Sequence, residues 1–265
     1  MREVFAEELK QIQLEILKDV AAYCEEHGIC YVLKYGTLLG AVRHKGYIPW
    51  DDDIDIAMPR PDYDRFVKEY GRGFYKVLEY SKDKKYPYAF AKVVDTRTAL
   101  HEPSQIKYPM GIYIDIFPVD GVPADLQERA VFLKKANRLA HMANLKKVSF
   151  DYPVDWKHRL IHIAVKTLML PISNRRLVAW QVKHTTKYPF DTSERAGVMT
   201  IRHTYSDGSS KRTCFEKRMD VEFEGCMFKA PEEYDTYLTD MYGNYMQLPP
   251  DSKRVSHHCF KAYIE

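Results

Sequence analysis

The run KYGTLLGAVRHKGYIPWDDDIDI occupies residues 34–56 and decides how this chain is expected to fold. It ends in four aspartates, and Asp53 and Asp55 alternate with isoleucines, as residues on one face of a strand do. Most short aspartate runs are solvated turns, and Asp51 to Asp53 fit that interpretation too. A turn, however, does not explain the continuing alternation. Because crowded carboxylates repel one another and are costly to desolvate, the run predicts a divalent-cation site at a strand end.

The residues before the aspartates suit a phosphorylated ligand. A buried strand is predicted over residues 29–35 and leads into Gly36, and Thr37 is predicted to cap a short helix that ends near Val42. The first turn of a helix has free backbone N–H groups that bind phosphate. The strand, turn and helix are therefore expected to form an anion-binding cradle.

A second strand-like run, GIYIDIFP at residues 111–118, carries one aspartate, Asp115, in an apolar setting. An unpaired buried aspartate is costly, so Asp115 either caps a local backbone group or joins Asp53 and Asp55 around the same cation. The presence of the other two acids favours the shared site.

These patterns together resemble a known family. The Gly-Thr turn, the strand with two aspartates and the later strand with a third are similar to the nucleotidyltransferase superfamily. The longer string from Gly36 to Asp55 resembles the LicD family of phosphocholine transferases, to which the fukutin-like proteins are related. The blocks IDIFP at 114–118 and YGNYMQLPP at 242–250 agree with it, although residues 121–218 carry no motif that aligns.

The resemblance implies a fold and a site. The fold class is α/β (α+β), a nucleotidyltransferase-like small mixed sheet flanked by helices, with a basic helical insertion. Asp53, Asp55 and Asp115 would be the catalytic acids and the ligands of Mg²⁺ or Mn²⁺. The residues expected to bind the donor are Gly36, Thr37, Arg43, His44, Lys45, Trp50, Asp52, Arg254 and His257.

The resemblance also implies a reaction. A phosphoalcohol group, phosphocholine in the first instance, would pass from a CDP-linked donor such as CDP-choline to a hydroxyl of a cell-surface glycan or teichoic-acid precursor, releasing CMP. Three alternatives remain open: a nucleotidyltransferase that attaches the nucleotide itself, a transferase that uses CDP-ribitol or CDP-glycerol, and a non-catalytic glycan- or membrane-binding module. The intact acids argue against the last of these.

Composition indicates the compartment. The five cysteines are odd in number and include no Cys-x-x-Cys pair, so isolated thiols in a reducing environment are favoured over a zinc site. The charged N-terminus does not resemble a signal peptide, and no apolar run is long enough to span a bilayer. A cytoplasmic protein is expected.

The chain is expected to have three parts: a catalytic core at 1–120, a basic helical lobe at 121–200, and a segment at 201–265 that completes the core. Twelve Lys and Arg between Leu133 and Lys187 face only Asp151 and Asp155, so this lobe is strongly basic. It is either a solvated helical lobe, with the apolar residues 160–170 packed inside, or a surface for peripheral contact with the inner face of the membrane or with a polyanionic acceptor. Nucleic acid is not expected, because no binding module accompanies the charges.

The remaining pattern predicts further elements. Apolar residues at helical spacing predict a first helix that stops at Gly28, and a second helix is expected at 61–70. Strands are expected at 74–80 and 88–95, a hairpin around Gly225, and a helix from Pro231 to Gly243.

Overall fold

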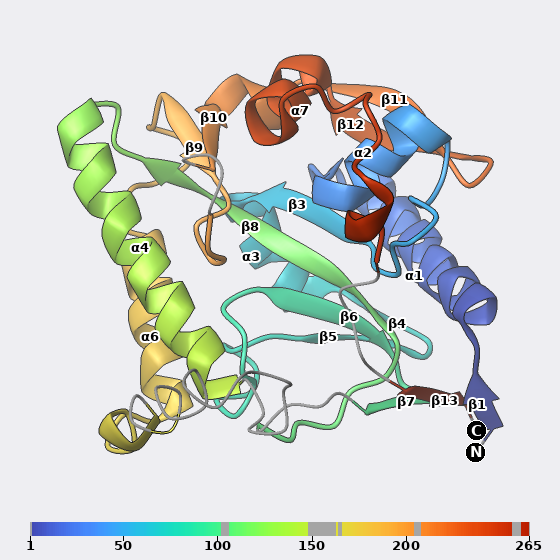
Figure 1. Ribbon diagram of the computed structural model, residues 1–265, viewed down its shortest axis with the longest axis horizontal. Helices are drawn as coiled ribbons and strands as arrows, with labels where there is room; N and C mark the ends of the chain where they lie inside the picture. The colour runs from blue at the N-terminus through green and yellow to red at the C-terminus, as the bar shows by residue number, and fades with distance from the viewer. Residues whose placement is uncertain are drawn as a thin grey trace.

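A mixed sheet of eight strands lies at the centre of the computed structural model (Figure 1). The structure describes residues 2–101, 106–147, 163, 166–203, 208–255 and 261–264. The strands of the main sheet are β2 (Val32–Leu33), β3 (Asp55–Pro59), β4 (Gly71–Arg72), β5 (Tyr75–Leu78), β6 (Ala91–Asp95), β8 (Tyr113–Val122), β9 (Arg195–Gly197) and β10 (Ser209–Lys211). The α/β fold class expected from the sequence is confirmed.

The order of the strands places the acids next to one another. The main path is β10-β9-β8-β6-β5-β4, and β3 pairs with both β2 and β8. The pair of β3 and β8 is parallel, and its register sets Asp55 directly opposite Asp115. β9 also pairs with β8, so both ends of the basic segment at 121–200 are attached to this sheet.

Two smaller sheets complete the strands. β1 (Arg2–Val4), β13 (Lys261–Ile264) and β7 (Thr98–His101) form one of them, which brings the two ends of the described chain side by side (Figure 1). The other is the predicted hairpin, β11 (Arg218–Phe223) and β12 (Cys226–Pro231). Its two turn residues, Glu224 and Gly225, both have left-handed backbones, which two-residue hairpin turns require.

Helices cover the sheet. They are α1 (Ala6–His27), α2 (Tyr35–His44), α3 (Arg60–Glu69), α4 (Leu126–Lys147), α6 (Asn174–Thr185) and α7 (Tyr234–Tyr242), with 3₁₀ turns η1 (Arg212–Phe215) and η2 (Asp251–Lys253). The apolar face of α1 packs into the same core as Ile56 of β3 and Ile114 of β8. Gly28, at φ +62°, ends α1 as predicted. No helix within the described ranges is both long enough and apolar enough to cross a bilayer.

Three local predictions were wrong. The strand expected at 29–35 is only two residues long, because Tyr35 takes a left-handed φ of +46° and starts α2. Thr37 is not the helix cap; Lys34 is, and the Thr37 hydroxyl is used elsewhere. The helix expected at Pro231 begins at Tyr234, since Pro231 is still paired in the hairpin.

The basic segment forms a pair of helices, α4 and α6, at one side of the sheet (Figure 1). Met169 joins them, because it is buried against Ala143 of α4 and Leu177 of α6. The apolar run at 160–170 lies partly outside the described residues. In its described part, Leu168 and Leu170 are exposed, so the interpretation that these leucines pack inside is wrong.

A buried ion pair holds α3 to the sheet and generates a prediction. Arg60 binds Asp120 of β8 through two hydrogen bonds of 2.7 and 2.8 Å, while its contact with exposed Asp64 is 3.4 Å long. Replacing one member leaves an uncompensated buried charge, so Asp120→Ala should lower the free energy of unfolding by about 3–5 kcal/mol in urea titrations. Asp64→Ala is the matched control and should cost at most about 1 kcal/mol. Equal effects of the two changes would contradict this account.

Candidate active site

Five aspartates meet where β3 begins. Asp55 is the first residue of β3, is only 8% exposed, and its backbone N–H donates to the Thr37 hydroxyl at 2.8 Å. Asp115 lies opposite it on β8. Asp51, Asp52 and Asp53 precede the strand, and each offers a carboxylate oxygen within 4.8 Å of the others'. The structure therefore brings together all the acids that the sequence singled out, from two distant segments.

The electrostatics of Asp55 show how closely these acids approach. Burial raises the pKa of Asp55 well above its ordinary value, and the charges of Asp53, Asp115 and Asp51 raise it further. Lys92 acts in the opposite direction. A bound divalent cation would neutralise these carboxylates and so offset the cost of their burial and of their mutual repulsion.

Lys92 is a site residue that the sequence interpretation missed. It lies on β6 in register with Asp115, is almost fully buried, and its Nζ is 2.5 Å from Asp115 Oδ1. The same ammonium group lies 3.3 Å from the centroid of the Tyr113 ring. The available signal was a lysine inside the apolar strand run AKVV, because such a charge is buried only when it is paired.

The carboxylate side chains fit a hard cation such as Mg²⁺ or Mn²⁺. The carboxylates that lie close together, however, are not the predicted set. Carboxylate oxygens are the ligands that Mg²⁺ and Mn²⁺ prefer. The tight cluster consists of Asp51, Asp52 and Asp53, and among the described residues it does not extend to Asp55 or Asp115. Asp51, which the sequence interpretation left out, therefore joins the candidate ligands. The assignment of Asp53, Asp55 and Asp115 as one metal-binding triad stays a prediction.

The backbone at Gly36 lies close to the Asp51 side chain of this cluster. A Cβ atom on Gly36 would overlap Asp51 Oδ2, so any larger residue there would displace the Asp51 carboxylate. The preceding residue, Tyr35, holds a left-handed backbone that costs a bulky side chain about 1–3 kcal/mol. An anion at the start of α2 would lie beside Asp51 and would need a cation between them.

Cationic and aromatic side chains gather at the other end of α2. Arg43 donates to the carbonyl of Tyr245 at 2.7 Å and to His44 Nε2 at 2.9 Å. The His44 ring meets Trp50 edge-on, and the Arg254 guanidinium lies 5.5 Å from the centroid of Trp50. Burial and the nearby charge of Arg254 lower the pKa of Arg43, as expected where two cations face the same space.

The other predicted donor-binding residues are placed differently. Lys45 ends α2 and forms a 3.9 Å ion pair with Glu222 of the hairpin. The backbone carbonyl of Asp52 accepts a 3.1 Å hydrogen bond from Gln13 of α1. His257 lies outside the described residues.

A buried lysine beside the site was also missed. Lys34 is 1% exposed, and its Nζ lies 3.9 Å from the ring centroid of Tyr237, 4.7 Å from that of Phe215 and 5.3 Å from that of Tyr35. Burial lowers the pKa of Lys34 to about 7. No sequence signal could have shown this, because two of the three rings come from segments about 180 and 200 residues further along the chain.

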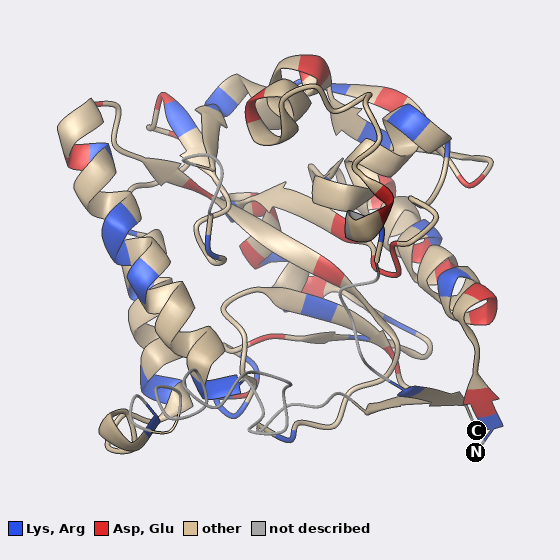
Figure 2. Ribbon diagram, viewed as in Figure 1, with Lys and Arg blue, Asp and Glu red and all other residues tan. Residues whose placement is uncertain are grey.

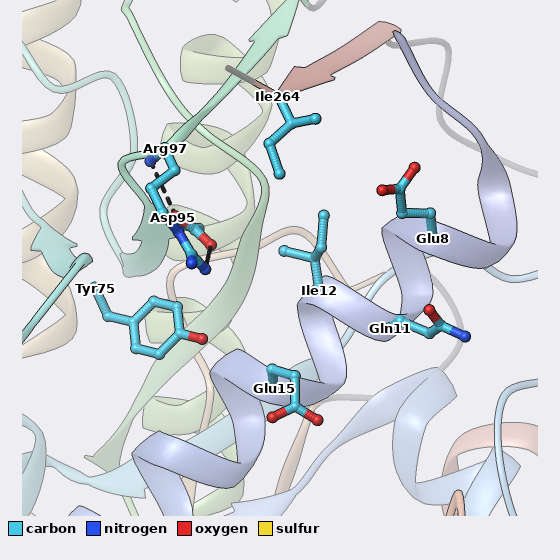
Figure 3. Close-up of a pocket in the computed structure, with 8 residues that line it drawn as sticks. All are labelled: Glu8, Gln11, Ile12, Glu15, Tyr75, Asp95, Arg97 and Ile264. Carbon is cyan, nitrogen blue, oxygen red and sulfur yellow. Dashed lines mark hydrogen bonds and ion pairs between the residues drawn. The ribbon is translucent and has the colours of Figure 1, made fainter. Parts of the chain in front are cut away.

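A hollow on another part of the surface is a weaker candidate for an active site. It lies between α1, β5, β6 and β13 (Figure 3) and is lined by Glu8, Gln11, Ile12, Glu15, Tyr75, Asp95, Arg97 and Ile264. Its charged groups are already paired: Arg97 binds Asp95 at 2.6 Å, and Glu8 binds Arg2 at 2.5 Å. The five aspartates are therefore the stronger candidate for an active site.

Comparisons with known proteins agree with the sequence patterns. The family described as LicD/FKTN/FKRP, nucleotidyltransferase domain, matches residues 28–175. The chain is 32% identical to the lipopolysaccharide cholinephosphotransferase LicD of Haemophilus influenzae over 270 aligned residues, which cover 100% of both proteins. Uncharacterised proteins of Rickettsia prowazekii and Rickettsia typhi are each 46% identical over 48 residues, 18% of this chain and 18% and 16% of theirs.

The raised pKa of Asp55 predicts a pH-dependent stability in metal-free buffer. The unfolded chain ionises this group near its ordinary value of 3.8, whereas the folded state resists ionisation, so the penalty is absent at low pH and grows as the pH rises above 3.8. Asp55→Asn removes the penalty and should raise the melting temperature near pH 7, by an amount that shrinks toward pH 4. Exposed Asp191→Asn is the control and should change little at either pH. A less stable Asp55→Asn variant at pH 7 would overturn this assignment.

Proposed function

Because the chain belongs to the LicD family, we propose that it is a transferase that moves phosphocholine from CDP-choline to a hydroxyl group of a lipopolysaccharide-type glycan and releases CMP. The observation that carries the proposal is the gathering of five aspartates at the start of β3, in a chain that aligns over its full length with a lipopolysaccharide cholinephosphotransferase. The donor has a diphosphate, and a cluster of carboxylates is the usual protein partner of a metal-bound diphosphate.

The bond changes define what the residues must do. The acceptor oxygen forms a bond to the phosphorus that carries choline, and the bond from that phosphorus to the bridging oxygen breaks. CMP leaves with the electron pair, and the proton of the acceptor hydroxyl passes to a base. A Mg²⁺ or Mn²⁺ ion held by the aspartates, with Asp53 and Asp55 as the central ligands, would supply charge neutralisation to the diphosphate.

Asp115 is the candidate that completes the site or orients and deprotonates the acceptor hydroxyl. Its ion pair with Lys92, at 2.5 Å, holds the carboxylate in one position. Preorganisation of this kind is what a positioned base requires, because a misplaced carboxylate loses the alignment on which proton transfer depends.

Arg43 and Arg254 are the candidates for holding the phosphate of the leaving CMP. Arg254 lies over Trp50, and Arg43 donates to His44, whose ring meets Trp50. Burial and the charge of Arg254 already disfavour the charged form of Arg43, which lowers its pKa. A phosphate between them would relieve that repulsion and accept charge-assisted hydrogen bonds. Arg254 also pairs with Asp251 at 2.6 Å and Lys45 with Glu222 at 3.9 Å, so a phosphate would compete with these carboxylates for either cation.

A second function is favoured by one observation: the matching family is described as a nucleotidyltransferase domain. The same carboxylates would serve a reaction in which the nucleotide is attached to the acceptor and pyrophosphate leaves. Incubation with CTP and with CDP-choline, CDP-ribitol and CDP-glycerol in turn distinguishes the reactions. CMP release from CDP-choline supports the proposal, CMP release only from CDP-ribitol or CDP-glycerol replaces choline by another alcohol, and pyrophosphate release from CTP supports the nucleotidyltransferase.

Removal of either central carboxylate should stop the reaction. Asp53→Asn and Asp55→Asn each delete a negative ligand, and losses on the order of 10²-fold or more in the rate of CMP release are expected, comparable to those for removal of a transition-state contact. Asp191→Asn, an exposed acid on another part of the surface, is the control and should keep full activity. Circular dichroism should show that all three variants fold. Full activity in either site variant would remove the metal assignment.

The turn at Gly36 gives an independent prediction about the donor. Gly36→Ala places a methyl group against the Asp51 carboxylate and should weaken binding of CDP-choline with Mg²⁺ by about tenfold or more in calorimetric titrations. Gly71→Ala is a matched control, because a Cβ atom there meets no atom within 4 Å and its φ is not left-handed. Unchanged donor affinity in Gly36→Ala would show that this turn is not part of the donor site.

A further inference from the structure

The helices α4 and α6 carry almost only positive charge, and the one acid within them is Glu128 in the first turn of α4. No Asp or Glu occurs from Arg129 to Lys147 or from Lys166 to Lys187, two stretches that together hold eleven Lys and Arg. Figure 2 shows blue segments along both helices and a red one only at the start of α4, whereas red and blue alternate on α1. Surfaces that serve only solubility usually mix the two signs. The bias therefore indicates a negatively charged partner.

One face of α6 presents this charge in a line. Arg176, Trp180 and Lys183 follow a spacing of four and three residues, which keeps them on one side of α6, and Lys187 lies two residues beyond the end of that helix. The last three also line a groove between the two helices, together with Lys135, Leu139 and His184. His184 contacts the carbonyl of Phe132 in α4 at 2.9 Å and so ties the helices together. Lys187 also donates to Tyr188 and lies 4.0 Å from Glu128.

Exposed apolar side chains lie in the segment that leads into α6. Met169 is buried between the helices, but the residues on either side of it, Leu168 and Leu170, are 82% and 72% exposed. Trp180 is also 46% exposed. Arg175 and Arg176 follow closely at the start of α6. Exposed leucines just before a helix that carries lysines, arginines and a half-exposed tryptophan form the pattern of proteins that lie on a membrane surface.

We infer that this face, defined by Lys135, Leu168, Leu170, Arg176, Trp180, Lys183 and Lys187, docks on an anionic lipid bilayer. Leu168 and Leu170 would enter the acyl boundary, Trp180 would lie at headgroup depth, and the lysines would contact lipid phosphates. The leucines favour lipid over a soluble glycan or nucleic acid, because only the acyl chains of a bilayer offer an apolar environment in which exposed aliphatic side chains can be buried. This docking goes beyond the proposed function but is consistent with it, because an acceptor of the lipopolysaccharide type is itself an amphiphile.

The test is flotation of the full chain with vesicles. Wild type should float with mixed phosphatidylcholine and phosphatidylglycerol vesicles and not with phosphatidylcholine alone. Lys135→Gln, Lys183→Gln and Lys187→Gln combined should weaken binding by about fivefold per charge, on the order of 10²-fold in total, and wild-type binding should decrease with added salt. Leu168→Ser with Leu170→Ser should weaken binding even at low salt.

A matched control separates this face from net charge. Exposed Lys68, Lys76 and Lys217, on other elements, replaced together by glutamine, change the charge by the same amount and should leave flotation intact. Equal loss in both triple variants, or no flotation of wild type, overturns the inference. Binding to heparin without binding to vesicles also overturns it, in favour of a polyanion. CMP release from soluble donor should be unchanged in every docking variant. If wild type releases no CMP, that result counts against the proposed function and not against the docking.

Discussion

The parallel pairing of β3 with β8 is the constraint on which the site depends. It sets Asp55 opposite Asp115, two carboxylates that would repel across adjacent strands. A parallel pair needs a crossover, and here the crossover runs through α3 and β4 to β7. That crossover delivers β6 in antiparallel register on β8, and with it Lys92 against Asp115. The same connection that brings the acids together thus also supplies the buried cation that makes their proximity tolerable.

Much of this arrangement could be predicted from local pattern. The alternation of aspartate and isoleucine predicts a strand with one polar face. The strand is present, but it begins only at Asp55, after Asp53, and all five of its residues are buried. Gly28 and the hairpin at Gly225 follow from backbone chemistry alone. What could not be predicted depends on partners far away in the sequence. Lys92 belongs to the site only through sheet register, and the Thr37 hydroxyl, which could have capped its own helix, instead accepts a hydrogen bond from Asp55 of the next strand. Asp51 was not among the predicted ligands, because only the folded chain brings it against Gly36.

The C-terminal quarter of the chain completes the site from a distance of about 200 residues. The Tyr245 carbonyl accepts from Arg43, Arg254 lies over Trp50, and the hairpin tip holds the loop after α2 through a hydrogen bond from the N–H of Tyr47 to Glu224. The segment that matches the family ends at residue 175, before any of these contacts. The acids are therefore the part of the site that the family segment contains, and the candidate phosphate-binding cations depend on segments outside it.

The site also concentrates unfavourable features. Within 22 residues the chain holds a buried lysine among aromatic rings, a left-handed Tyr35, and a buried aspartate surrounded by like charge. Each of these costs folding free energy. Such a cluster is stable only because the core around it is extensive, with Ile54, Ile56 and Ile114 fully buried. A cation and a diphosphate would offset the charge repulsion among the carboxylates and between Arg43 and Arg254, so binding should be driven partly by relief of strain already present in the free protein. A site of this kind is poised for ligand at the expense of its own stability.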